Sequence, residues 1–317
     1  MKKYDIAAIG ELNVDIILNG IESEPEIGKE KFCKDMIVTL GSSTAIFAAN
    51  AAALGSKVCF VGLVGNDSFG DLVKTSLAAK GVATHFIGTG DTPTGATICM
   101  SYGEDRANLT YQGSMDVMGF DQIDKSVFDL SKHIHLSSLF MQSALLRDID
   151  KVLDLAKEKG VTVSLDTQWD PMEKWALDYA RVLPRITVFM PNEKELCALT
   201  GKDNLEDAIA EVRPYLGNMM LVKCGSKGSL LIKKDGSRKL LPAFLNKDVV
   251  DAIGAGDSFN SGFISAFVKG LSPEDCQVTG NLTGAVNTTA AGGTGAFTSL
   301  EDVRAVCKTK FGKELPL

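Results

Sequence analysis

The sequence predicts an α/β protein with a central, mostly parallel sheet flanked by helices and with a small β-sheet lid. The first observation is that short apolar runs of strand length alternate along the chain with segments of helical periodicity. This alternation is typical of a parallel sheet that is covered by helices on both faces. The second observation is that two segments, about 12–40 and 92–115, interrupt the alternation and form the candidate lid. The 317 residues contain no linker or repeat, so we expect a single domain over residues 1–317.

The alternation begins near the N-terminus and continues beyond the middle of the chain. The runs that predict strands cover residues 6–9, 58–64, 134–136, 161–165, 187–190 and 220–223. The segments that predict helices cover residues 43–54, 69–80 and 145–159. Each of these three segments is followed by the residue that most often ends a helix, namely Gly55, Gly81 and Gly160.

The two interrupting segments have different patterns. Residues 94–111 alternate apolar and polar side chains around 103–106, which is typical of a half-exposed β-hairpin. Residues 22–39 are charged and show no helical period. We expect the two segments to form a small sheet that closes over a ligand as a lid. An insertion without function and a contact between two copies of the chain are left open as alternatives.

Charge and cysteine content exclude some classes of protein. The formal net charge of −7 predicts no general attraction to nucleic acid or to an anionic membrane. The seven cysteines are odd in number and none are spaced C-x-x-C, so we expect reduced thiols in the cytoplasm rather than disulfides or a zinc site. The apolar stretch at the N-terminus is too short for a signal peptide or a membrane span.

A glycine-rich turn carries the strongest local indication of chemistry. Gly254 and Gly256 allow a ligand to approach the backbone, and the turn opens into an apolar helical stretch at 264–268. The free N–H groups in the first turn of a helix attract a phosphate. Asp257 lies in that first turn, where it is either a helix-capping residue or a general base for phosphoryl transfer. The motif by itself leaves these two interpretations equally open.

Two common nucleotide-binding motifs are absent from the sequence. The first predicted strand ends in Gly10-Glu11-Leu12-Asn13, which lacks the second glycine of a dinucleotide-binding fingerprint. No G-x-x-x-x-G-K-[ST] segment occurs, so the chain is not a P-loop kinase.

Two polar residues follow the first predicted strand. Asn13 and Asp15 are spaced i, i+2, so on an extended segment their side chains point to the same side. Ligands bind at the carboxyl ends of strands in open α/β sheets, and an amide with a carboxylate can bond neighbouring sugar hydroxyls. The alternative is that both residues simply form a turn.

Five segments resemble, in this order, the signatures of the ribokinase-like, or PfkB, family of carbohydrate kinases. They are residues 41–55, 61–70, 191–195, 222–228 and 251–259. The resemblance covers nearly the whole chain. It implies the ribokinase-like fold with a β lid over the sugar, and ATP-dependent phosphorylation of a hydroxymethyl group of a sugar or sugar derivative.

The resemblance also implies roles for individual residues. The catalytic base would be Asp257, beside an anion hole formed by Gly254, Ala255 and Gly256. The acceptor would be bound by Asn13, Asp15, Gly41 and Ser42. The nucleotide would lie near Asn192, Lys223, Gly225, Ser226 and Gly228. The cofactors would be ATP and Mg²⁺, with Mg²⁺ held through water by Glu195. A K⁺ site would use Asp251, the Ile253 carbonyl and the turn between Ala290 and Gly295. The spacing of Asn192 and Glu195 also predicts a helix N-cap closed as a capping box, and both roles can hold together.

The sequence departs from the family pattern near the acceptor. Ser42 replaces the second glycine of the glycine signature, and Ile46 stands where relatives carry an asparagine that touches the sugar. An apolar side chain there removes a hydroxyl partner, so the identity of the acceptor is not predicted. A nucleoside kinase of the same family and a non-catalytic sugar- or nucleotide-binding regulator are left open as alternatives. The implied partners are a small-molecule sugar and ATP, and a homodimer through the lid is a further expectation.

Six other residues carry weaker predictions. His133 and His135 lack a third metal ligand nearby in the sequence, so packed or hydrogen-bonded imidazoles are favoured over a metal site. Asp166, at the end of a predicted strand, is a secondary candidate for the site, whereas Trp169 and Trp175 are expected to serve packing. Arg106 in the hairpin is interpreted as a solvated charge, with contact to an acidic or phosphorylated sugar as the alternative.

Overall fold

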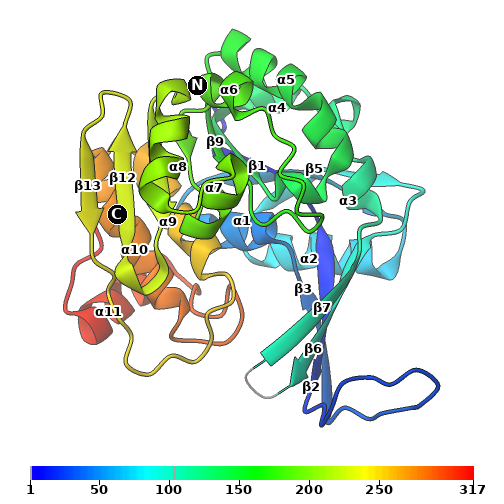
Figure 1. Ribbon diagram of the computed structural model, residues 1–317. Coiled ribbons are helices and arrows are strands. Elements are labelled where there is room, and N and C mark those ends of the chain that lie inside the picture. Colours follow the sequence, from blue (N-terminus) through cyan, green and yellow to red (C-terminus); the bar gives the residue numbers. More distant parts are fainter. Residues whose placement is uncertain (1, 103–104) are drawn as a thin grey trace.

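The computed structural model describes residues 2–102 and 105–317, except for the side chains of Asp105 and Arg106, and contains two sheets (Figure 1). The larger sheet has nine strands in the order β13-β12-β11-β10-β9-β8-β1-β4-β5. Its strands are β1 (Tyr4–Ile9), β4 (Val58–Gly65), β5 (Ala83–Gly90), β8 (Ser131–Ser137), β9 (Thr162–Asp166), β10 (Val188–Phe189), β11 (Met219–Lys223), β12 (Ser229–Lys233) and β13 (Arg238–Leu241). All neighbouring strands are parallel except β12, which is antiparallel to β11 and β13. The predicted mostly parallel sheet is therefore confirmed.

Helices cover both faces of this sheet. One face packs against α1 (Ser43–Ala53), α2 (Ser68–Ala79), α9 (Ala255–Val268) and α10 (Pro273–Asn287). The other face packs against α4 (Ser126–Leu130), α5 (Ser143–Glu158), α6 (Tyr179–Val182), α7 (Glu193–Thr200) and α8 (Leu205–Val212). Two more helices are α3 (Ser114–Val117) and α11 (Leu300–Phe311). Strand β1 shows why both faces need cover: Ile6 and Ala8 face one layer, Ala7 and Ile9 the other, and all four are fully buried.

The predicted helices begin and end within two residues of α1, α2 and α5. The glycines that were expected to end them, Gly55, Gly81 and Gly160, all have positive φ, which is the backbone conformation that glycine adopts at helix ends. No helix in the described part of the chain is long and apolar enough to cross a membrane.

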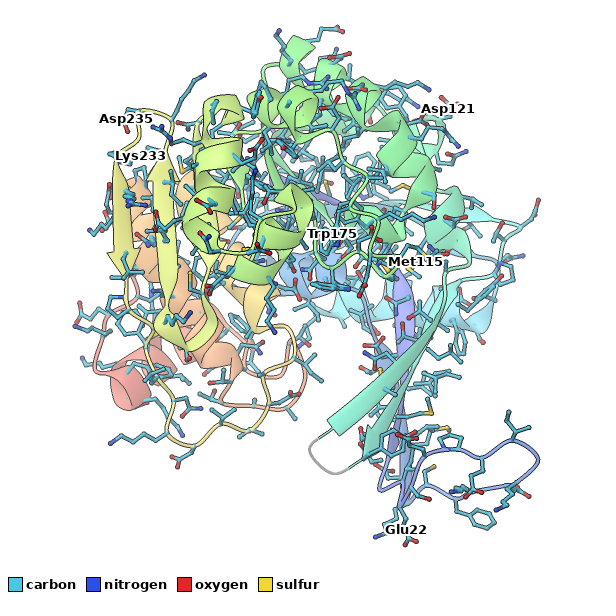
Figure 2. All side chains as sticks on the ribbon, in the orientation of Figure 1. Glu22, Met115, Asp121, Trp175, Lys233 and Asp235 are labelled. Atoms are coloured by element: carbon cyan, nitrogen blue, oxygen red, sulfur yellow. The ribbon has the colours of Figure 1, made fainter. Side chains whose placement is uncertain are left out.

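The smaller sheet has four strands in the order β3-β2-β6-β7, which are β2 (Asn13–Asn19), β3 (Asp35–Leu40), β6 (Gly95–Tyr102) and β7 (Asp105–Tyr111). Strands β6 and β7 form the predicted antiparallel hairpin, and β2 pairs with β6 in parallel. The sheet projects from the main body beside α2 and α3 (Figure 1). Figure 2 shows Glu22 at its far end and Met115 near its junction with the larger sheet.

The two faces of the small sheet differ in character. Asn13, Asp15, Thr97 and Thr110 lie on the face that lines a cavity. The paired residues Ile16, Ile98 and Leu109 form an apolar row on the opposite face. Period-2 alternation along the strands produces this separation, so a polar surface faces the cavity.

Candidate active site

A cavity with a volume of 1520 Å³ lies between the small sheet, the carboxyl ends of the parallel strands and the N-terminus of α9. It is the place where an open α/β sheet is expected to bind ligands. Nearly all of the predicted site residues line it, namely Asn13, Asp15, Ser42, Asn192, Glu195, Lys223, Gly225, Ser226, Gly228, Asp251, Ile253, Gly254, Ala255, Gly256, Asp257 and Gly295. The fold thus brings together residues from both ends of the chain.

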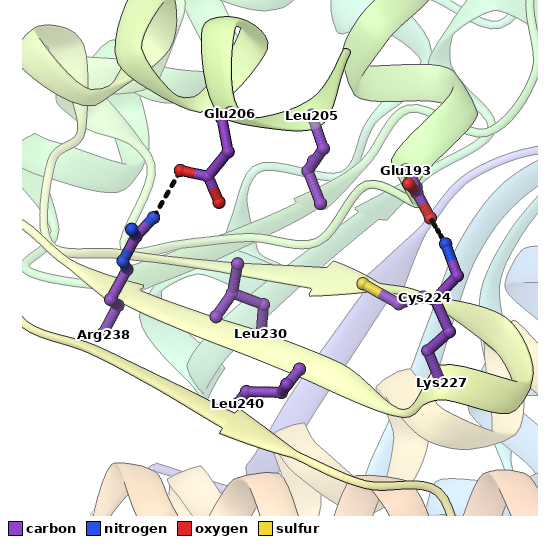
Figure 3. A pocket seen from close by; sticks show the side chains of 8 residues that line it. All are labelled: Glu193, Leu205, Glu206, Cys224, Lys227, Leu230, Arg238 and Leu240. Atoms are coloured by element: carbon purple, nitrogen blue, oxygen red, sulfur yellow. Dashed lines mark hydrogen bonds and ion pairs between the residues drawn. The ribbon is translucent and has the colours of Figure 1, made fainter.

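A second, smaller pocket of 380 Å³ lies between α8 and strands β12 and β13 (Figure 3). Its charged groups are already paired, because Arg238 Nη1 lies 2.7 Å from Glu206 Oε2 and Lys227 Nζ lies 3.3 Å from Glu193 Oε2. Leu230 and Leu240 form its apolar floor. This pocket therefore presents no unpaired chemical group, and the larger cavity is the candidate active site.

The predicted anion cradle lies at the N-terminus of α9. Gly254 is the N-cap residue with φ of 73°, and a Cβ atom there would lie 2.7 Å from the Cα of Gly293, so only glycine fits. The amide groups of Gly256 and Asp257 lie in the first turn, where the helix itself offers no acceptor. A Cβ atom on Gly256 would lie 3.7 Å from Lys223 Nζ. A positive side chain therefore stands next to the exposed amides.

Buried hydrogen bonds hold the loops around this cradle. The Asn50 side chain donates to Ser258 Oγ over 2.9 Å and to the Gly293 carbonyl over 2.8 Å. Ser258 Oγ donates to Asn287 Oδ1 over 2.7 Å, and Asn287 Nδ2 donates to the Ile253 carbonyl over 2.7 Å. Helices α1, α9 and α10 are thereby tied to the turns that precede and face Gly254.

Asp257 is buried at the floor of the cavity, with 6% of its surface exposed. Its Oδ1 accepts a hydrogen bond from Gln168 Nε2 over 2.7 Å, a contact for which the helix-capping interpretation does not account. Burial raises the pKa of Asp257 to about 8, and the negative charges of Asp166 and Glu11 act in the same direction against Lys223 and the Gln168 bond. Asp257 is therefore a stronger base than an ordinary aspartate.

A buried ion pair lies next to Asp257. The Lys223 ammonium contacts Asp166 Oδ2, which also accepts a hydrogen bond from Asn260 Nδ2 over 2.5 Å. Burial alone would lower the pKa of Lys223, but the carboxylates of Asp166 and Glu195 raise it, so the ammonium stays charged. Asp166, a secondary candidate in the sequence, thus forms an ion pair that keeps the Lys223 ammonium beside the anion cradle.

Asn192 and Glu195 form the predicted capping box at the start of α7. Asn192 Oδ1 accepts from the Glu195 amide over 2.9 Å, and Glu195 Oε2 accepts from the Asn192 amide over 2.7 Å. Burial and the nearby Asp166 carboxylate raise the pKa of Glu195 to about 7, while Lys223 opposes this. The Glu195 carboxyl group lines the cavity, and its second oxygen takes no part in the capping box.

Three of the residues predicted to lie near the nucleotide, Gly225, Ser226 and Gly228, are on a turn after β11. Residues Gly225–Lys227 form a single 3₁₀ turn, and Gly225 and Gly228 have φ of 56° and 106°. A Cβ atom on Gly228 would lie 2.0 Å from the Leu241 carbonyl oxygen, so the chain needs glycine to pass there. Ser226 is presented to the cavity from this turn.

The candidate K⁺ loops are joined by one carboxylate. Asp251 Oδ1 accepts from the Ile253 amide and Oδ2 accepts from the Gly292 amide, each over 2.9 Å. The loop before α9 thus meets the turn that contains Ala290 and Gly295. Gly295 lines the cavity, and Ala290 directly precedes the lining residue Ala291.

Asn13 and Asp15 lie together at the start of β2, as their spacing predicted. Asn13 Nδ2 donates to Asp15 Oδ1 over 3.0 Å and to Thr97 Oγ1 over 3.1 Å. Burial raises the pKa of Asp15, and the bond from Asn13 opposes this shift. Gly41 packs directly against the pair, because a Cβ atom there would lie 2.4 Å from Asp15 Oδ1.

The two departures from the family pattern have structural roles. Ser42 has φ of 74° and caps α1: its hydroxyl accepts from the Ala45 amide and donates to the Glu11 carbonyl. Ile46 packs against the anion cradle, because a Cβ atom on Gly254 would lie 3.2 Å from Ile46 Cγ2. Ile46 therefore lies between the cavity, which it lines, and the turn that precedes Asp257.

Many lining residues were not predicted as members of the site, and Glu11, Gln168 and Trp169 are among them. Trp169 was expected to pack, yet it is 46% exposed at the cavity while its ring meets Trp175 edge-on. Glu11 and Gln168 could have been found in the sequence from their positions, because they closely follow the carboxyl ends of β1 and β9, where ligands bind.

Two other sequence predictions concern the histidines His133 and His135 and the hairpin residue Arg106. His133 and His135 are hydrogen-bonded imidazoles, as predicted, with the Thr162 and Ser164 hydroxyls as partners. Burial lowers the pKa of each to about 3. The prediction for the Arg106 side chain lies outside the described residues. Within the described residues, no cluster of three or more His, Cys, Asp or Glu side chains could hold a metal ion.

Comparison with known proteins defines the class to which this fold and site belong. The model of the pfkB family carbohydrate kinases matches residues 3–299. A ribokinase of Arabidopsis thaliana is 29% identical over 317 residues, 96% of this chain and 80% of the relative. An ATP-dependent ribose-1-phosphate kinase of Halopiger xanaduensis is also 29% identical, over 298 residues, 93% of this chain and 95% of the relative. The structure of Arabidopsis thaliana ribokinase complexed with ribose and ATP superimposes with a TM-score of 0.81 at 25% identity, over 97% of this chain and 99% of that one.

The chain belongs to the pfkB family of carbohydrate kinases. The predicted ribokinase-like fold and the predicted enzyme class, an ATP-dependent carbohydrate kinase, are both confirmed.

Proposed function

We propose that the protein transfers the γ-phosphoryl group of ATP to a hydroxymethyl group of a sugar or sugar derivative, with Asp257 as the general base. The observation that carries this proposal is the position of Asp257. Its buried carboxylate lies in the first turn of α9 and lines the same cavity as Asn13 and Ser226, the residues proposed for the acceptor and for the nucleotide. A base at this place can serve an acceptor and an ATP that bind in one cavity.

The chemical step requires a proton acceptor and a place for negative charge. The acceptor hydroxyl oxygen attacks the γ-phosphorus, and its proton passes to Asp257 Oδ2, the oxygen that Gln168 does not bond. The bond from the γ-phosphorus to the β–γ bridging oxygen breaks, and its electron pair leaves with ADP. The amides of Gly256 and Asp257, with Lys223 beside them, supply positive potential to the phosphoryl group in transfer.

The residues at the nucleotide side fit a magnesium ion held through water. Mg²⁺ prefers oxygen ligands and keeps several waters, and the second Glu195 oxygen is the hard donor in this place. When bound, the ion would neutralise charge on the phosphates. Asn192 and Glu195 hold each other through the capping box, so the carboxylate is fixed in position before the nucleotide arrives.

The K⁺ proposal rests on Asp251 and the Ile253 carbonyl, which lie within one hydrogen-bonded loop. Oxygen ligands from a carboxylate and from backbone carbonyls suit such a cation. The Ile253 carbonyl already accepts one bond from Asn287, and its second lone pair is the one available to an ion.

The test of the proposed function is the substitution Asp257→Asn, which keeps the shape and removes the base. We expect kcat to fall by about 10²–10⁴ with KM values for both substrates changed little. Asp302→Asn is a matched control, because Asp302 occupies the same third position of α11, is exposed and lies outside the cavity. Activity of Asp257→Asn within a few-fold of the wild type would rule out Asp257 as the base.

A nucleoside is the second candidate acceptor. Phe47, the aromatic residue in the segment 41–55, is fully buried and stacks on His135, so it is not available to a base. Trp169 is exposed at the cavity, and base–aromatic stacking on it would favour a nucleoside. Turnover of nucleosides in preference to free sugars would support this candidate, and binding of every acceptor without turnover would instead favour a non-catalytic regulator.

We further propose that the small sheet acts as the lid over the acceptor and as the contact between two copies of the chain. The polar face of the sheet lines the cavity, and the opposite apolar face is exposed toward its distal end. A lid that orders on binding would exclude water from the phosphoryl group.

A further inference from the structure

We propose that the acceptor side of the cavity selects an uncharged polyol and rejects acceptors that carry a phosphate or a carboxylate. The acceptor side is the part of the cavity between Asp257 and the small sheet. This inference rests on the proposed function, because it names the class of acceptor for the same reaction. Sequence identity does not settle the question, since the chain is equally similar to a ribokinase and to a ribose-1-phosphate kinase.

The titratable side chains described on the acceptor side are two carboxyl groups, and burial raises the pKa of each. Glu11 and Asp15 both line this side, one at the end of β1 and the other on β2. Among the described side chains that line the cavity, Lys223 is the one cation. Its ammonium contacts Asp166. A phosphate or carboxylate on the acceptor would therefore meet two carboxyl groups and, among the described side chains, no unpaired cation.

The N-terminus of α1, on the acceptor side, already holds a carboxyl group of the chain itself. Helix α1 begins at Ser43, and an anion would normally find free amides there. Glu11 Oε1 accepts from the Thr44 amide over 3.2 Å, and Glu11 Oε2 accepts from the Thr44 hydroxyl. Glu11 is only 4% exposed, so it occupies these donors permanently. The occupation does not depend on whether Glu11 carries its proton.

The other polar groups on the acceptor side suit hydroxyls. Asn13, Asp15 and Thr97 form one hydrogen-bonded cluster, and Thr97 also bonds Thr110 over 3.0 Å. Asp15 Oδ2 takes no part in the bond from Asn13 and can accept from a sugar hydroxyl. A polyol donates to a carboxylate and accepts from a hydroxyl, whereas an anion can only accept. The cluster therefore matches a neutral polyol.

Arg106 is a basic residue of the small sheet, and its side chain is not among those described. It pairs in register with Ser101, which is four residues beyond Thr97 on the same strand. At 3.3 Å per residue, the backbone of Arg106 is therefore about 13 Å from that of Thr97 along the strand direction. The variant Arg106→Ala therefore belongs in the test.

The experiment compares matched pairs that differ by one charged group: ribose with ribose 1-phosphate, fructose with fructose 6-phosphate, and glucose with gluconate. Turnover is measured by coupled ADP formation in the full-length protein. Binding is measured separately by intrinsic fluorescence, since the chain has two tryptophans and they lie together, with Trp169 at the cavity. In every pair with a detectable ligand or substrate, we expect the neutral member to exceed its anionic partner by about 10² in kcat/KM and in affinity.

The variants assign the selection to Glu11. Glu11→Gln should narrow the ratio between neutral and anionic members, whereas Glu22→Gln, an exposed residue in the segment between β2 and β3, should leave it unchanged. The wild-type ratio tests the inference even if Glu11→Gln does not fold. An anionic member that binds or reacts as well as its neutral partner would overturn the inference, and loss of that activity in Arg106→Ala would identify the cation responsible. Neutral sugars that bind selectively without turnover would instead overturn the proposed kinase reaction and leave the acceptor class standing.

Discussion

The side-chain amide of Gln168 joins two carboxylates, because Nε2 donates to Asp257 Oδ1 over 2.7 Å and to Asp166 Oδ2 over 3.3 Å. Both amide hydrogens are used, so the orientation of the Asp257 carboxylate is tied to the buried ion pair with Lys223. Gln168 has φ of 57°, a conformation that non-glycine residues rarely adopt and that is common at functional sites. Gln168 is therefore a positioning residue for Asp257.

We predict that Gln168→Ala lowers kcat by about 10–10² and leaves the KM for ATP unchanged, because the base loses its fixed orientation. The hydrogen bond from Gln168 also lowers the pKa of Asp257. Without this bond, the part of the kcat/KM profile that rises with pH should move to higher pH. The measurement is a pH–rate profile between pH 6 and 10.

Gln168→Asn is the control for backbone effects. Asparagine tolerates positive φ better than most residues, but its shorter side chain does not reach Asp257 as glutamine does. We expect Gln168→Asn to be as slow as Gln168→Ala while remaining as stable as the wild type. An unchanged pH profile in both variants would contradict the positioning role.

The raised pKa of Asp257 predicts a change of stability with pH. An aspartate normally has a pKa of 3.8, and in the folded protein the pKa is about 8, so the folded state binds more protons between these values. The stability that protonated Asp257 contributes is full below the ordinary pKa and is lost as pH rises toward 8. The loss is at most about 1.4 kcal/mol per pH unit. Asp257→Asn lacks this dependence.

We therefore expect Asp257→Asn to become more stable relative to the wild type as the pH rises from 5 to 8. The measurement is the difference in Tm or in urea midpoint between the two proteins across this range. Asp302→Asn should show no such growth, because Asp302 is exposed and its pKa is lowered by bonds from the Thr298 and Ser299 hydroxyls. A constant difference would mean that Asp257 is charged throughout this range.

Most of the parallel sheet could be predicted because its strands are buried on both faces and therefore read as continuous apolar runs. Strand β13 did not give this signal: it is an edge strand, and Arg238 and Lys239 are exposed on it. Strand β3 was hidden in the same way, since its residues from Asp35 to Val38 are exposed and charge dominates the segment before it. A strand that is buried on one face or on neither face has an apolar pattern too weak to detect in the sequence.

The site was predicted where a motif is local and missed where the contact is made by folding. The Gly254–Asp257 turn and the capping box of Asn192 and Glu195 depend on residues within a few positions, so spacing revealed them. Gln168 lies 89 residues from Asp257 in sequence, and Asn50 lies 208 residues from Ser258. Such contacts arise only when strands and helices are stacked, and a single sequence carries no period that reports them.

The buried pair of Lys223 and Asp166 predicts a thermodynamic cycle. Lys223→Met should destabilise the protein by roughly 3–5 kcal/mol, because it leaves the Asp166 carboxylate buried without its cation. Adding Asp166→Asn removes that charge and should restore much of the stability. Urea unfolding of the two single variants and the double variant measures the coupling.

The same double variant separates stability from catalysis. Its kcat should stay low although its stability recovers, because no ammonium remains near Gly256 and the anion cradle. Recovery of activity together with stability would mean that Lys223 has only a structural role.

Gly41 predicts a steric effect on the acceptor alone. In Gly41→Ala the new Cβ atom would lie 2.4 Å from Asp15 Oδ1 and 2.7 Å from Asn13 Nδ2, so this pair must shift. We expect the KM for the acceptor to rise at least about tenfold with the KM for ATP unchanged. Gly90→Ala is the matched control, because its Cβ atom would make an ordinary contact of 3.7 Å with Leu63. Equal effects on both KM values would argue against an acceptor site at Asn13 and Asp15.

The apolar face of the small sheet predicts an association of two copies. Met36 is 61% exposed and Leu109 is 65% exposed, and the register with β2 and β6 places them on the same face. A contiguous exposed apolar face of this kind favours a symmetric contact that buries the same surface on both chains. We expect a dimer by sedimentation velocity at micromolar concentration.

Met36→Glu and Leu109→Glu should each shift this dimer toward monomer, because a carboxylate would be buried in the contact. Leu240→Glu is the matched control: Leu240 is also 61% exposed but lies on β13, at the far edge of the larger sheet. If the small sheet must be held by a partner to cover the acceptor, the two dimer-breaking variants should also raise the KM for the acceptor while the control does not. A monomeric wild type, or dissociation by Leu240→Glu alone, would contradict the small sheet as the contact.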